Sequence, residues 1–183
     1  MADTGFVTTT RGRSVTGIGS AAWSVPSNIL SDNGVFSASI VPTGGRSNWL
    51  VADTFGFSVP GGDTVVGVEV KMESKVNTTS PNKMYISQAK LGKDDSTFGT
   101  DKADVTMPLD TASPWLTTFG GPTDLWGLSL TPAEVNASGF QFRFHAYNVE
   151  SYSLLAQVDI IQAKVYYETP SGVIAFSRGF IIT

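Results

Sequence analysis

The chain has 183 residues, of which 41% are hydrophobic and only 15% charged, with a formal net charge of −4 and no cysteine. This length and apolar content predict one domain with a packed core, and they exclude a long charged disordered tail. The negative charge argues against a nucleic-acid partner, which needs a basic surface, and the missing thiols exclude disulfides and cysteine-ligated zinc.

The first twenty residues are rich in Thr, Ser and Gly and show no amphipathic period, so residues 1–20 are predicted to form an extended N-terminal arm. They contain no apolar signal-peptide core, and no run in the chain approaches the length that spans a bilayer. We therefore expect a protein that does not insert into membranes. From Trp23 onward, short alternating runs separated by turn residues predict an all-β domain over residues 21–168.

The clearest strand runs from Val65 to Val76, where apolar and charged residues alternate with the period of a half-buried antiparallel strand. Further strands are predicted over residues 48–58, 85–91, 103–109, 140–147 and 158–167. Between the later ones, Thr131-Pro-Ala-Glu134 has the pattern of a capping box and predicts one short helical turn. This succession predicts an all-β fold, an antiparallel β-sandwich of the jelly-roll type.

One segment, FGGPTDLWG over residues 119–127, combines turn residues with a tryptophan just before the helical turn. It is either a ligand-binding loop or a structural corner, and we favour the corner. The residues assigned to it are Gly120, Gly121, Pro122, Asp124, Trp126 and Gly127. The glycines would allow the tight turn, Asp124 would cap backbone amides, and Trp126 would fill the edge of the sandwich.

No catalytic site is visible. His145 is the only histidine, which excludes a two-histidine metal site, and no G-x-S-x-G motif accompanies it. No pair of carboxylates has a pattern expected of a glycoside hydrolase, and no motif indicates a metal or a cofactor. The sequence therefore predicts a protein that is not an enzyme.

A binding face is predicted on the strand at residues 140–147, whose phenylalanines alternate with polar side chains. The residues assigned to this glycan-binding or interface face are Gln141, Arg143, His145 and Tyr147, together with Trp115. Tryptophans can stack on sugars or fill the core; Trp49 and Trp126 are expected in the core, and for Trp115 both roles stay open.

The C-terminal segment, residues 169–183, contains an apolar cluster that would promote aggregation if it were left bare. It is predicted either to dock on a partner or to form a last strand of the sandwich. The residues assigned to docking are Val173, Ile174, Phe176, Phe180, Ile181 and Ile182.

Scattered motifs resemble a group of virion proteins from tailed bacteriophages and prophages. The matching positions are Trp23-x-x-Pro26-x-Asn28, Asp32-Asn33-Gly34, Leu50-x-Ala52-x-x-Phe55-Gly56-Phe57-Ser58-x-Pro60, Val65-Val66-Gly67-Val68-Glu69-Val70, Phe119-Gly120-Gly121, Asp124-Leu125-Trp126-Gly127, Thr131 to Asn136 and Asp159 to Tyr167. The resemblance covers roughly residues 23–168 and leaves out both ends of the chain.

This resemblance implies a non-enzymatic structural protein of the virion: a capsid decoration protein, or a fibre or tail component. Its partners would be other capsid or tail proteins, it would form a homo-oligomer, with a trimer as the first guess, and it would assemble in the host cytoplasm. The alternative is a carbohydrate-binding module that serves host-surface adhesion in a phage tail or baseplate, with a cell-surface glycan as its partner.

Overall fold

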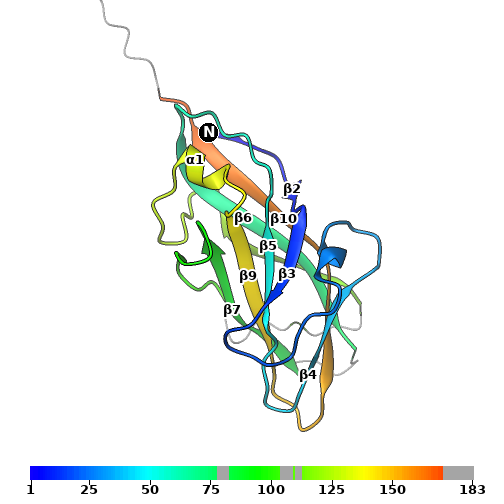
Figure 1. The fold of residues 1–183 in the computed structure, drawn as a ribbon. Helices are drawn as coiled ribbons and strands as arrows, with labels where there is room; N and C mark the ends of the chain where they lie inside the picture. The colour runs from blue at the N-terminus through cyan, green and yellow to red at the C-terminus, as the bar shows by residue number, and fades with distance from the viewer. Residues whose placement is uncertain (78–82, 104–108, 110–112, 171–183) are drawn as a thin grey trace, which may run out of the picture.

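The computed structural model describes residues 1–77, 83–103, 109 and 113–170. They form two antiparallel sheets packed face to face (Figure 1), which confirms the predicted β-sandwich. In the first sheet the main order is β1-β10-β6-β8, and β2 and β4 also pair with β10. Its strands are β1 (Ala2–Asp3), β2 (Val7–Thr8), β4 (Ser37–Val41), β6 (Thr64–Val76), β8 (Trp115–Gly121) and β10 (Leu154–Glu168).

The second sheet has the order β3-β5-β9-β7. Its strands are β3 (Arg11–Val15), β5 (Trp49–Asp53), β7 (Met84–Gly92) and β9 (Gln141–Asn148). From β3 to β10, successive strands alternate between the two sheets, so each connection crosses the sandwich, as in a jelly roll. Because of this alternation, the connecting loops lie at the two ends of the sandwich and do not form part of either sheet.

The first twenty residues are not a separate arm. β1 and β2 pair with β10 of the first sheet, and β3 pairs with β5 of the second, so the N-terminal segment closes one edge of both sheets. Phe6, between β1 and β2, lies beneath the ammonium groups of Lys71 and Lys164, at 4.0 and 4.3 Å from its ring centre. The predicted boundary between arm and domain is therefore wrong. The segment belongs to the sandwich through main-chain hydrogen bonds, which need no alternation of apolar side chains and so leave no such pattern in the sequence.

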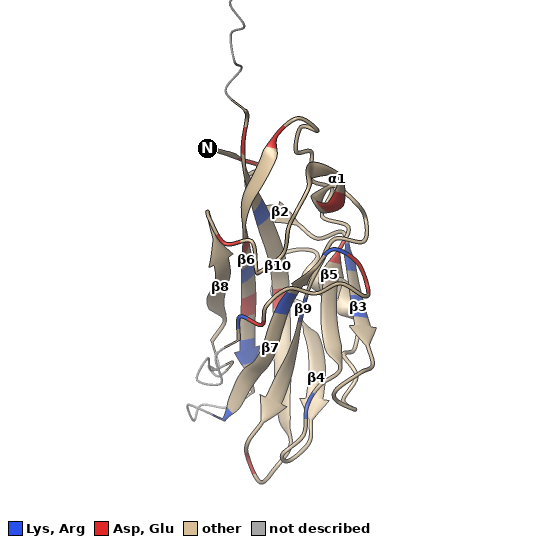
Figure 2. Ribbon diagram, turned by 90° about the vertical axis from the view of Figure 1, so that its left-hand side faces the viewer, with Lys and Arg blue, Asp and Glu red and all other residues tan. Residues whose placement is uncertain are grey.

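The core lies between the sheets and is rich in aromatic residues. Phe140, Phe142 and Phe144 are fully buried, and the ring of Phe142 contacts those of Phe119 and Trp126. Acidic and basic residues alternate along β6 (Figure 2), and their partial exposure places them on its outward face, as the sequence predicts for a half-buried strand. β7, β9 and β10 are confirmed close to their predicted positions, whereas the strand predicted over 48–58 ends at Asp53.

Two short helical segments interrupt the strands. α1 (Pro132–Val135) has the predicted capping box, in which Thr131 accepts from the Glu134 amide and the Glu134 carboxylate accepts from the Thr131 amide. A 3-10 turn, η1 (Pro26–Ile29), is an addition that the sequence did not reveal. None of the helices in the described residues has the length and apolarity needed to cross a membrane.

Candidate functional site

The polar side chains of β9 lie on the outward face of the second sheet, as their alternation predicts, but most of them are not open to solvent. The exposed fractions of Gln141, Arg143 and His145 are 0%, 8% and 1%, so the predicted open face is wrong for these three residues. Tyr147 alone is half-buried and borders solvent. The reason is a second layer of side chains, which covers β9 from neighbouring strands and loops.

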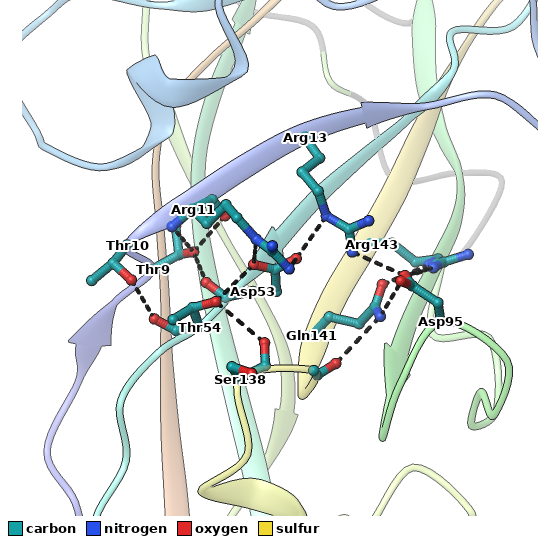
Figure 3. Close-up of polar contacts among 11 residues, drawn as sticks. Thr9, Thr10, Arg11, Arg13, Asp53, Thr54, Asp95, Ser138, Gln141 and Arg143 are labelled. Carbon is teal, nitrogen blue, oxygen red and sulfur yellow. Dashed lines mark hydrogen bonds and ion pairs between the residues drawn. The ribbon is translucent and has the colours of Figure 1, made fainter.

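One half of this face is filled by an ionic network centred on Asp53 (Figure 3). The Asp53 side chain is fully buried, and its carboxylate accepts from Arg11 Nε at 2.5 Å and from Arg13 Nε at 2.7 Å. Arg13 extends further and donates from Nη2 to Asp95 Oδ1 at 2.9 Å. The two arginines thereby fasten β3 to β5 and to the loop that follows β7.

The same network absorbs two of the predicted face residues. Gln141 Nε2 donates to Asp95 Oδ1 at 3.1 Å, and Arg143 Nη2 donates to Gln141 Oε1 at 2.7 Å. The guanidinium of Arg143 lies 3.8 Å from the Phe98 ring centre, and burial lowers the pKa of Arg143. The polar side chains of this ionic network bond to one another, so this half of the face connects strands and loops rather than forming a ligand site.

His145 lies in the middle of the face, between the ionic network around Asp53 and the half that borders Tyr147. Its ring packs against Trp49 in a T-shaped arrangement, with the centroids 4.7 Å apart. Burial, aided by the positive charge of Arg46, lowers the pKa of His145 to about 4. His145 is therefore neutral at physiological pH, and its buried ring packs between charged neighbours.

The other half of the face forms a pocket of about 340 Å³, lined by Arg46, Tyr85, Ser87, Tyr147 and Val149. Tyr85 and Tyr147 are directly opposite each other on β7 and β9, so their side chains stand side by side on the outward face. Arg46 comes from the loop before β5 and forms a backbone bridge with Tyr147. Its guanidinium carbon lies 4.6 Å from the Tyr147 ring centre, and its Nε donates to Ser87 Oγ at 3.5 Å.

The residues that line the pocket include no carboxylate. Its lining has one cation, two phenols, one hydroxyl and one aliphatic side chain. Glu150, which follows Val149 in the chain, pairs with Lys83, with 2.6 Å between Oε1 and Nζ. The lining offers aromatic surface, hydrogen-bonding groups and a positive charge.

The segment at 119–127 turns the chain out of β8 and buries its tryptophan. The Trp126 side chain is fully buried and its Nε1 donates to the Val68 carbonyl at 2.9 Å. Asp124 Oδ1 accepts from the Trp126 amide at 2.8 Å, while its other oxygen pairs with Lys102 Nζ at 2.8 Å. These bonds, with the charge of Lys102, keep the pKa of Asp124 below its ordinary value despite the opposing effect of burial.

Two glycines of this segment have positive φ angles, Gly120 and Gly127, both at 70°. A Cβ on Gly120 would collide with the Val68 carbonyl, so the backbone approach that buries Trp126 requires glycine there. Gly121 ends β8 beside open space, and Pro122 is exposed.

Trp115 is 61% exposed, as a sugar-stacking residue would be, but it begins β8, the edge strand of the first sheet. It does not line the pocket on the second sheet, so the structure does not unite it with the β9 residues. Trp126 is buried in the core, as expected. Trp49 is buried as well, but it lies on the outward face against His145 and Arg143, so its predicted place in the core is wrong. The predicted docking residues Val173, Ile174, Phe176, Phe180, Ile181 and Ile182 and the strand segment 104–108 lie outside the described residues.

A separate group of three carboxylates lies on the first sheet: Glu73 of β6 and Asp159 of β10, with Asp32 from the loop before β4, and one oxygen of each is within 4.8 Å of the others. Asp159 is buried and accepts from the Gly34 amide at 2.8 Å. Burial, and then repulsion by the other two carboxylates, raises the pKa of Glu73. Carboxylate oxygens are donors of the type that Ca²⁺ prefers, and it completes its six to eight ligands with bidentate carboxylates, carbonyls and waters.

The sequence did not point to most of the pocket. Tyr147 was assigned to a binding face, and Tyr85 and Ser87 lay in a predicted strand, but Arg46 and Val149 carried no signal. Only strand pairing could have joined Tyr85 to Tyr147, and Arg46 reaches them from a Gly-Gly-Arg turn whose direction the sequence does not specify.

No family model and no curated protein matches this chain. Among solved structures, it is similar to the N-terminal cellulose-binding domain of β-1,4-glucanase C from Cellulomonas fimi, with a TM-score of 0.39 and 12% identity over 92% of this chain and 91% of that one. It is also similar to a chain crystallised with a xylogluco-oligosaccharide, with a TM-score of 0.45 and 11% identity over 86% of this chain and 38% of that one. Both likenesses are too distant to bear on function.

Proposed function

We propose that this protein is a non-catalytic carbohydrate-binding module whose site is the pocket between β7 and β9. The observation that carries the proposal is the pairing of Tyr85 and Tyr147 in a pocket of about 340 Å³ that also presents Arg46 and Ser87. Sugars have apolar C–H faces and hydroxyl edges. Tyrosines with an apolar ring and a polar tip, flanked by a few hydrogen-bonding groups, match both surfaces.

The size and composition of the pocket also support binding rather than catalysis. Its volume is near the lower end of the usual range for small-molecule sites, which suits one or two sugar units of a chain. The missing carboxylates argue against glycoside hydrolysis, which uses a pair of them. A role in the virion, with capsid or tail partners and a homo-oligomeric state, stays a prediction.

The test is a glycan array probed with the wild-type protein, the Tyr147→Ala variant and the Trp115→Ala variant. We expect wild-type binding that is lost in Tyr147→Ala and kept in Trp115→Ala, because Tyr147 lines the pocket and Trp115 does not. Circular dichroism verifies that each variant is folded. An array without any binding, or binding that is indifferent to Tyr147→Ala, would refute the proposal.

A further inference from the structure

We propose that the pocket selects a sugar that carries a carboxylate, a uronic-acid unit of a glycan, and that Arg46 is the residue that selects it. This inference rests on the proposed function and specifies its ligand. It starts from Arg46, because the surroundings of this arginine differ from those of Arg11, Arg13 and Arg143.

Arg46 is the one arginine in the described ranges that no acid neutralises. Arg11 and Arg13 share Asp53, and Arg143 lies 3.6 Å from Asp95, whereas no carboxylate of the described residues is within ion-pair distance of Arg46. An exposed arginine without an acid is common by itself. Here, however, the guanidinium lies at the wall of a pocket that contains no competing acid.

The guanidinium is also held in position for a ligand. Its contact with the Tyr147 ring, at 4.6 Å, and the hydrogen bond from Nε to Ser87 Oγ, at 3.5 Å, fix its orientation beside the pocket. Guanidinium presents parallel N–H groups whose spacing matches the two oxygens of a carboxylate. A uronic-acid ring packed against Tyr85, beside the Tyr147 ring that Arg46 covers, would bring its carboxylate to these donors, while Ser87 would remain near a ring hydroxyl.

The overall charge of the protein makes this preference specific to the pocket. At a net charge of −4 the molecule repels acidic polymers as a whole, so non-specific attraction cannot produce selectivity for them. Any preference for an acidic glycan must then arise locally, and the described lining has Arg46 as its only cation.

The experiment compares uronic-acid oligosaccharides with their carboxyl-reduced counterparts, which have the same linkages and ring shapes without the charge. Affinities are measured for the wild type, Arg46→Gln, Tyr147→Ala and Lys90→Gln. Lys90→Gln is the matched control, since it removes the same charge from β7 outside the pocket lining.

We expect the wild type to prefer the acidic member of a pair by about 10- to 100-fold, as for a charge-assisted hydrogen bond. Arg46→Gln should abolish that preference, Lys90→Gln should keep it, and Tyr147→Ala should weaken binding of both members. Equal binding of both members, with loss in Tyr147→Ala, would overturn the selectivity and leave the carbohydrate site standing. A preference that survives Arg46→Gln would also overturn it, and no binding of any pair would refute the site itself.

Discussion

The guanidinium of Arg46 lies over the ring of Tyr147, with 4.6 Å between its carbon and the ring centre. Such a contact contributes about 0.5–1 kcal/mol at an exposed site, enough to favour one arrangement of a long side chain. The backbone bridge between the same two residues ties the loop before β5 to β9. The pocket is thus largely formed before a ligand arrives, which lowers the entropic cost of binding.

Trp126→Ala should lower the free energy of unfolding by about 3–5 kcal/mol, because it removes a fully buried indole and leaves the Val68 carbonyl without its donor. Trp115→Ala should change it by less than about 0.5 kcal/mol, since that side chain is mostly exposed. Urea denaturation followed by circular dichroism measures both. Equal losses in the two variants would show that Trp126 does not anchor the segment at 119–127.

Asp53→Asn should cost about 3 kcal/mol of stability, because Arg11 and Arg13 would lose the buried carboxylate that both contact. Asp95→Asn is the matched control and should cost less than about 1 kcal/mol, since the Asp95 side chain is 67% exposed. Hydrogen exchange should show faster opening of β3 in Asp53→Asn. Unchanged protection of the β3 amides would contradict the role of Asp53 in holding β3 against β5.

His145 should make the protein less stable in mild acid. Its pKa is about 4 in the folded protein and about 6.5 when unfolded, so the stabilisation from keeping it neutral is complete above about pH 6.5. It declines as the pH falls toward about 4, since only the unfolded chain takes up the proton there. Urea denaturation at about pH 7 and about pH 5 should show this loss, and His145→Leu should reduce it. An equal loss in the variant would exclude His145 as its source.

Glu73→Gln should stabilise the protein at neutral pH when a chelator is present. The folded pKa of Glu73 is raised by burial and by the nearby Asp32 and Asp159, so the charged form is disfavoured in the folded state. This penalty is absent below the unfolded pKa and grows as the pH rises through the folded pKa. Thermal denaturation should show a higher Tm for Glu73→Gln than for wild type at neutral pH and no gain in acid.

Glu69→Gln is the control for that prediction, because Glu69 shares the outward face of β6 but accepts from the Tyr166 hydroxyl at 2.6 Å. It should lose stability or stay unchanged. A lower Tm for Glu73→Gln would mean that the three carboxylates do not repel one another as their separation indicates.

The strands with strong local patterns could be predicted from the sequence, and those fixed by distant partners could not. β6 follows from its alternation, and α1 follows from Thr131 and Glu134. β3 has no such pattern: Arg11 and Arg13 acquire their role only because Asp53, some forty residues later, is buried beside them.

The binding face was half predictable for the same reason. Alternation correctly places Gln141, Arg143 and His145 opposite the phenylalanines, but it does not reveal that Asp95, Phe98 and Trp49 cover them. Tyr147 is left uncovered at the end of the strand. Its partner Arg46 comes from a turn a hundred residues earlier, a relation that no local rule contains.

The most direct test of the carbohydrate site is an amide NMR titration of the wild-type protein with the glycan that binds best on the array. The shifted amides should cluster at Arg46, Tyr85, Ser87, Tyr147 and Val149, and they should not include Trp115. Shifts confined to β8 around Trp115, or to the loop that holds Asp95, would place the ligand elsewhere and contradict a site between β7 and β9.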